Sequence, residues 1–157
     1  MSFLVSDTQA ERHAKIRGFL GEGEWFIAAL LSAADFEWTV RRGILALGQS
    51  PTVEIRQNTL VTCTGLDRYK DAWKREVKPS RGHGLPEVIP DWQGFTKAFK
   101  LRHVLIHGIR GTAELSYASE RVERILRASE AVCTYAHTHN VNLYQRLPVR
   151  RRPRGPL

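Results

Sequence analysis

The chain contains 157 residues, of which 42% are hydrophobic and 25% are charged. This length and composition are typical of one globular domain with its own core, and they exclude a multidomain architecture. The two cysteines, Cys63 and Cys133, are far apart in the sequence, which excludes a disulfide framework and a four-cysteine zinc site. With neither feature available, a reducing cytoplasm is the expected location. No apolar run approaches the roughly 20 residues that cross a bilayer, so we expect no membrane contact.

The formal net charge is +8, from 24 Lys and Arg residues against 16 Asp and Glu residues. Much of the excess lies in the last segment, RLPVRRRPRGPL, which contains no acidic residue. Because this segment is rich in proline and poor in apolar residues, we expect a folded domain over 1–140 and a basic, disordered tail over 141–157. Two roles fit the tail equally well. Arg150, Arg151 and Arg152 could bind RNA phosphates, or the charges could serve only to keep the chain soluble.

Helical periodicity dominates the sequence, and no segment shows the alternation of a strand, which predicts an all-α bundle of about five to six helices. A first helix is expected over 7–20, with Ser6 or Asp7 as its N-cap. The second is expected over 22–47, and its core-facing positions recur at helical spacing. These positions are Phe26, Leu30, Ala33, Glu37, Val40, Ile44 and Leu47.

Turn and cap residues separate the next helices. Ser50 and Pro51 favour the N-cap and first position of a third helix, which ends near residue 62. Thr64 and Asp67 resemble a capping box at the start of a fourth helix, ending near residue 77.

The second half of the chain begins with a segment rich in proline and glycine, 78–90, which predicts a loop. Asp91 is expected to cap a helix that extends to Gly108, and the last helix is expected over 115–139. That last helix carries a second core-facing stripe, formed by Leu115, Ala118, Val122, Ile125, Ser129, Val132 and Ala136.

The segment LRHVLIHG, on the helix that Asp91 begins, contains Arg102 and His107 with four residues between them. With the polar His103 directly after the arginine, this segment resembles the R-x4-6-H motif of the HEPN domain family, and the resemblance covers about residues 1–140. It implies an all-α bundle that forms a homodimer and cleaves RNA without a metal or other cofactor. Because HEPN proteins often act as toxins or antiviral effectors, it also implies a cognate antitoxin or regulatory protein as a partner.

Helical geometry separates the polar residues of this helix into two directions. At about 100° per residue, Lys100, His103 and His107 share one polar face, where Lys100 is a candidate RNA contact. Arg102 lies about 140° from His107, in an apolar sector, so its guanidinium needs a partner.

Glu37 is the candidate partner of Arg102, because it is the one acid on the core-facing stripe of the second helix. The resemblance allows Asp35 or Glu54 to fill this role instead. A carboxylate that accepts two hydrogen bonds from the guanidinium would fix the orientation of Arg102.

The candidate catalytic residues are therefore Arg102, His107, His103 and Glu37. Histidine exchanges protons near neutral pH, and arginine stays charged to stabilise the phosphate. Because Arg102 and His107 point in different directions, the dimer implied by the resemblance would bring two copies of each into one cleft. The sequence thus predicts a metal-independent endoribonuclease that acts on RNA.

Other interpretations stay open at this stage. The bundle could bind RNA or a protein without cleaving it, or it could be a structural adaptor. Arg102 could lie along apolar surface with its charged end in water, His107 could cap a helix C-terminus, and His103 could face solvent without a role. A weaker alternative is a metal site formed by Cys133, His137 and His139 together with His13 or His83.

Overall fold

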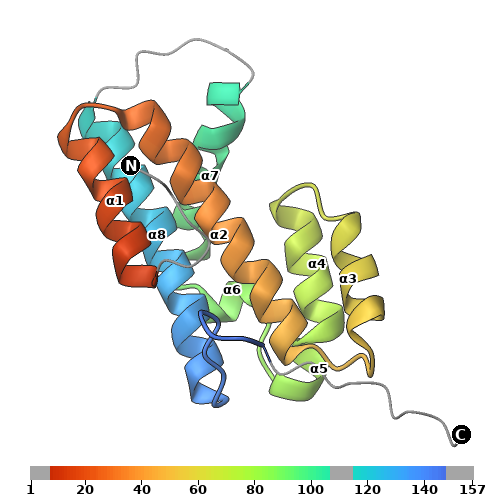
Figure 1. Ribbon diagram of the computed structural model, residues 1–157. Helices are drawn as coiled ribbons and strands as arrows, with labels where there is room; N and C mark the ends of the chain where they lie inside the picture. The colour runs from red at the N-terminus through yellow and green to blue at the C-terminus, as the bar shows by residue number, and fades with distance from the viewer. Residues whose placement is uncertain (1–7, 107–114, 148–157) are drawn as a thin grey trace, which may run out of the picture.

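The computed structural model describes the backbone of residues 8–106 and 115–147, and their side chains except those of 103–106, 115 and 116. Over these ranges the chain is all-α, as predicted, and no strand is present (Figure 1). No helix in the described part of the chain is both long and apolar enough for a membrane span. The helices are α1 (Gln9–Gly21), α2 (Trp25–Leu47), α3 (Val53–Val61), α4 (Leu66–Glu76), α5 (Lys78–Arg81), α6 (Leu85–Val88), α7 (Trp92–Ile106) and α8 (Leu115–Thr138).

Helix α2 is the central helix of the bundle. It lies between α1 and α8 on one side and α3 and α4 on the other, and it also contacts α7 (Figure 1). The predicted stripe is buried where these neighbours cover it, as at Ala33, Val40 and Ile44. Phe26, expected on the same stripe, is instead 43% exposed. The reason is that α3 and α4 lie beside the C-terminal half of α2 and do not cover its first turns.

The stripe predicted for α8 is confirmed. Its described members pack against α2, α7 and α1, and they are all buried: Ala118, Val122, Ile125, Ser129, Val132 and Ala136. The side chain of Leu115 lies outside the described residues.

The prediction of a continuous loop over 78–90 is wrong, because two single helical turns, α5 and α6, form there. Each begins with a proline in its first turn, Pro79 and Pro86, where the missing N–H costs nothing. Gly82 ends α5 with a left-handed φ of 95°. With these two turns the described residues form eight helices, more than the five to six expected.

Three helices, α1, α3 and α4, begin at a different cap from the one predicted. Helix α1 begins after Thr8, which forms a capping box with Glu11, while the expected caps at positions 6 and 7 lie outside the described residues. Helix α3 begins after Thr52, whose side chain accepts a hydrogen bond from the Ile55 N–H. Ser50 instead donates to the Glu76 carboxylate, 2.5 Å away.

Helix α4 begins after Gly65, and no capping box forms between Thr64 and Asp67. The cap predicted for α7 is present, since Asp91 Oδ1 accepts a hydrogen bond from the Gly94 N–H at 3.2 Å. A Ser, Thr or Asp side chain near the start of a helix thus caps the helix only where the backbone brings its oxygen within reach of a free N–H group.

The packed body continues past residue 140, where the sequence placed the start of the tail. Leu143 is buried in the core, and Tyr144 and Leu147 pack against it. Arg42 on α2 donates hydrogen bonds to the carbonyl oxygens of Leu143 at 2.5 Å and Gln145 at 2.7 Å. Residues 141–147 are therefore part of the folded domain, and residues 148–157 lie outside the described part of the chain.

Candidate functional site

The ion pair predicted between Arg102 and Glu37 is present in the structure. Nη1 of Arg102 on α7 donates a hydrogen bond to Oε1 of Glu37 on α2. The Arg102 side chain is 34% exposed and the Glu37 side chain 20% exposed. Arg102 is thus fixed by a carboxylate while part of its side chain stays open to solvent.

The position of Arg102 follows from the apolar face of α7. Phe95, Ala98 and Phe99 on that face are buried against the core, and Phe95 and Phe99 both pack on Phe36 of α2. This packing brings the side of α7 that carries Arg102 against α2. The guanidinium then lies at the edge of the core, where an unpaired charge would be costly.

Burial raises the pKa of Glu37, and the positive charges of Arg102 and then Arg41 act in the opposite direction. The cost of burying the carboxylate is thus larger than its attraction to the two guanidinium groups. As a result, Glu37 becomes protonated at a higher pH than an ordinary glutamate does.

Arg41 extends this site toward α4, and the sequence analysis missed it. Its Nε donates to the Tyr69 hydroxyl at 2.6 Å, and its Nη2 donates to the Cys63 carbonyl at 3.2 Å. Arg41 lies one helical turn after Glu37, and that spacing of four residues was the signal available in the sequence. A polar row, Arg102–Glu37–Arg41–Tyr69, therefore joins α7, α2 and α4.

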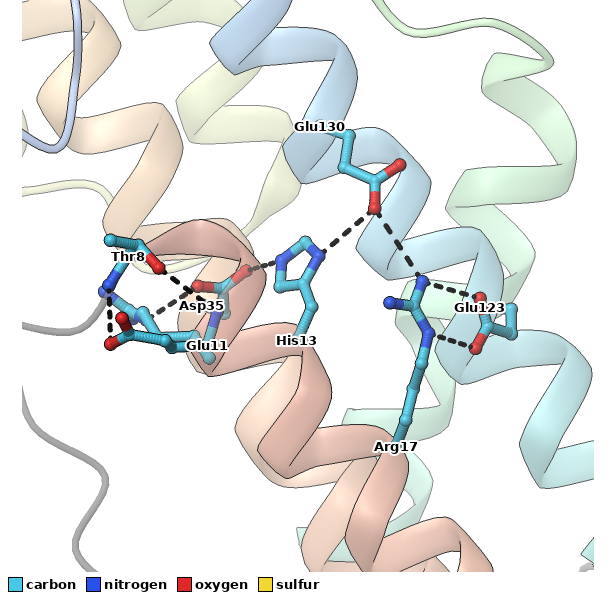
Figure 2. Close-up of polar contacts among 8 residues, drawn as sticks. Thr8, Glu11, His13, Arg17, Asp35, Glu123 and Glu130 are labelled. Atoms are coloured by element: carbon cyan, nitrogen blue, oxygen red, sulfur yellow. Dashed lines mark hydrogen bonds and ion pairs between the residues drawn. The ribbon is translucent and has the colours of Figure 1, made fainter.

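Asp35, an alternative partner of Arg102, has a different role. It is fully buried, with Oδ1 3.0 Å from Arg12 Nε and Oδ2 2.8 Å from His13 Nε2 (Figure 2). Glu54, the other alternative, is exposed in the first turn of α3 and forms no ion pair with the described residues. Of the three carboxylates considered, the structure joins Glu37 alone to Arg102.

Figure 2 shows that His13 lies between two carboxylates from different helices. Its Nε2 contacts Asp35 on α2, and its Nδ1 lies 3.2 Å from Oε1 of Glu130 on α8. Each ring nitrogen thus faces a carboxylate oxygen, and a ring nitrogen that carries a proton donates a hydrogen bond to it. His13 is 2% exposed, so its ring joins α1, α2 and α8 in the interior of the bundle.

The residues considered for a metal site are not brought together. Among the described residues no group of three or more potential ligands surrounds a common point. His13 is engaged as described, and His83 and His139 both contact the ring of Tyr135. Burial, followed by the charge of Asp35, raises the pKa of Cys133 to about 12. A thiol of that kind is a poor ligand, because metals bind the thiolate.

The other predicted site residues are only partly described. Lys100 is exposed on α7 and makes no ion pair with the described carboxylates. The backbone of His103 belongs to α7, but its side chain lies outside the described residues, as does all of His107. The tail arginines Arg150, Arg151 and Arg152 also lie outside them.

No protein-family model matches this chain, and no curated protein and no solved structure matches it significantly.

Proposed function

We propose that this chain is a metal-independent endoribonuclease of HEPN type whose active site is completed in a homodimer. The ion pair between Arg102 and Glu37 is the observation that carries the proposal. It holds the arginine of the R-x4-H segment in a defined position while leaving it partly open to solvent. A cation held in this way is ready to stabilise the charge that develops on a phosphate during cleavage.

Each residue of the segment has its own role in the reaction. A neutral His107 accepts the proton of the ribose 2′-hydroxyl, whose oxygen attacks the adjacent phosphorus. The 5′-oxygen then leaves and takes a proton from a charged histidine, either His107 of the second copy or His103. Arg102 stabilises the pentavalent phosphate, and Glu37 is a positioning residue for Arg102. The products are a 2′,3′-cyclic phosphate and a 5′-hydroxyl.

The first turns of α2 support association with a second copy. Phe26 and Ile27 are 43% and 38% exposed. Phe26 also belongs to the stripe of α2 that carries Glu37, about three turns nearer the start of the helix, so a copy packed along this stripe extends toward the Arg102 ion pair. Burial of such apolar side chains favours a symmetric dimer.

The wider role follows the same resemblance. We place the enzyme in the cytoplasm as a toxin or antiviral effector that a cognate antitoxin or regulatory protein holds inactive. Arg150, Arg151 and Arg152 add contacts to RNA phosphates outside the active site.

The test is to incubate the purified protein with mixed RNA in EDTA, beside His107→Ala. Wild type is expected to leave 2′,3′-cyclic phosphate ends, to spare DNA and to retain its activity in EDTA, because the nucleophile is the 2′-hydroxyl. His107→Ala is expected to bind RNA but not to cleave it. Cleavage of DNA, or activity that requires Mg²⁺, contradicts the proposal.

A second candidate is a non-catalytic RNA- or protein-binding bundle. The same ion pair favours it, because Glu37 neutralises Arg102 and the pair then also serves to hold α7 against α2. In that case wild type and His107→Ala bind RNA equally, and neither cleaves any substrate.

A further inference from the structure

A groove of about 320 Å³ lies between the start of α7 and the first half of α8, away from the Arg102 ion pair. More than half of its lining residues are charged. The side chains that matter for its chemistry are Asp91, Lys97, Tyr117, Glu120, Arg121 and Arg124.

The two carboxylates of the groove are both engaged by Arg124. Asp91 Oδ2 lies 2.5 Å from Arg124 Nη1, and Glu120 Oε1 lies 3.2 Å from Arg124 Nε. Gly94 leaves room for this arrangement, since a Cβ at that position would collide with Arg124 Nη1 and Asp91 Oδ2. The negative charge of the groove is therefore directed at one cation.

Lys97 and Arg121 are left without a carboxylate partner among the described residues. Lys97 is exposed and affects Asp91 only at longer range, after Arg124 and the Gly94 N–H. Arg121 donates a hydrogen bond to the Lys97 carbonyl oxygen. Burial and then the nearby charge of Arg124 lower the pKa of Arg121, so an anion placed here would relieve a repulsion between two cations.

Tyr117 supplies an aromatic surface beside these cations. Its side chain is 47% exposed, although it is a large ring at the edge of the groove. The guanidinium of Arg121 lies 4.0 Å from the centre of the ring, which is the geometry of a cation–π contact. Cations next to an exposed aromatic ring are the combination with which proteins bind single-stranded nucleic acid.

We propose that this groove binds a single-stranded segment of the RNA substrate, with phosphates on Lys97 and Arg121 and one base stacked on Tyr117. The inference rests on the proposed function for the identity of the ligand. Lys100, exposed one turn after Lys97, continues the basic surface along α7 toward the turn that carries Arg102. The groove would then hold a part of the strand that is not cleaved.

The experiment measures binding rather than cleavage. The full chain is titrated against a fluorescent single-stranded 2′-O-methyl RNA, which lacks the nucleophile and stays intact. Tyr117→Ala is expected to weaken binding by about 5- to 100-fold, the usual effect of losing one stacked base. Tyr117→Phe keeps the ring and is expected to bind like wild type.

The charge is tested by salt dependence. Lys97→Gln is expected to reduce the slope of log K against log salt by about 0.7, the value for one phosphate contact on a single strand. Lys74→Gln, an equal charge change at an exposed position of α4, is the control and is expected to leave the slope unchanged. Thermal unfolding of each variant checks that the fold is intact.

Three results would overturn the groove. The first is that Tyr117→Ala binds the RNA within twofold of wild type, and the second is that Lys97→Gln leaves the salt slope unchanged. The third is that a poly-glutamate peptide binds in place of RNA and loses as much affinity in Tyr117→Ala as the RNA was expected to lose. The outcome is separate from that of the proposed reaction. If the variants lose RNA binding but wild type never cleaves RNA, the groove stands and the ribonuclease proposal fails.

Discussion

Arg102 and Glu37 are 65 residues apart in the sequence and form an ion pair that joins α7 to α2. Neither side chain is fully buried, and burial raises the pKa of Glu37 in spite of its cationic neighbours. The pair therefore contributes little net stability, and its main effect is to fix the direction of the guanidinium.

Replacing Glu37 by Gln should separate these two effects. We expect kcat to fall by about tenfold, because a neutral amide holds the guanidinium less firmly. The free energy of unfolding should change by less than about 1 kcal/mol, because the Arg102 side chain is 34% exposed and stays hydrated, and because the variant no longer has to bury the Glu37 charge. Steady-state cleavage and urea denaturation measure the two quantities, with Glu54→Gln on α3 as the matched exposed control. A large loss of stability with unchanged kcat would assign the pair a structural role.

The raised pKa of Glu37 also predicts a pH dependence. As the pH falls through this pKa, Glu37 becomes neutral and Arg102 loses its charged partner, so activity should fall in weakly acidic solution. The contribution of Glu37 to the free energy of unfolding changes with pH in the opposite direction to the activity. It is present below the unfolded-state pKa and is lost as the pH rises through the higher folded-state pKa.

The measurement is kcat against pH for wild type and Glu37→Gln. Both proteins should share the acidic limb that protonation of the base His107 produces, and wild type should lose further activity as Glu37 becomes protonated, a loss that the variant lacks. If both proteins give the same profile, Glu37 does not control the orientation of Arg102.

The exposed start of α2 predicts that one substitution converts the proposed dimer to a monomer. Phe26→Glu places a charge where a second copy is proposed to pack, and burying that charge would cost several kcal/mol. Light scattering should then show a monomer with its fold intact, and cleavage should be lost. Ile55→Glu on α3, where the native side chain is 46% exposed, is the control and should remain a dimer. A wild-type protein that is monomeric at working concentration would contradict the model of a shared active site.

The buried His13 predicts a stability effect without a catalytic one. His13→Leu removes one of the partners of Asp35 and leaves that carboxylate buried with Arg12. We expect the free energy of unfolding to fall by about 3 kcal/mol in urea denaturation. His137→Leu, at the exposed end of α8, is the control and should change stability by less than about 0.5 kcal/mol. Equal stability in the two variants would show that His13, between Asp35 and Glu130, adds no net stability.

The sequence by itself was enough to predict the all-α class and the α8 stripe, and it made Glu37 the first candidate for the partner of Arg102, with Asp35 and Glu54 left open. These rest on local periodicity, because a helix of known pitch places residues on faces whatever it packs against. An arginine on an apolar face and an acid on another face avoid the cost of isolated charge when they meet each other. That argument needs no knowledge of how the helices are arranged.

The tertiary structure alone decided which faces are covered. Asp35 and Glu37 are two residues apart on α2 and therefore face different neighbours, so one binds Arg12 and His13 while the other binds Arg102. Phe26 and Ile44 both belong to one stripe, yet Ile44 is fully buried and Phe26 is 43% exposed. Helical periodicity repeats along the chain, whereas the number of neighbours around a central helix changes from turn to turn, and only the packing of the whole bundle sets it.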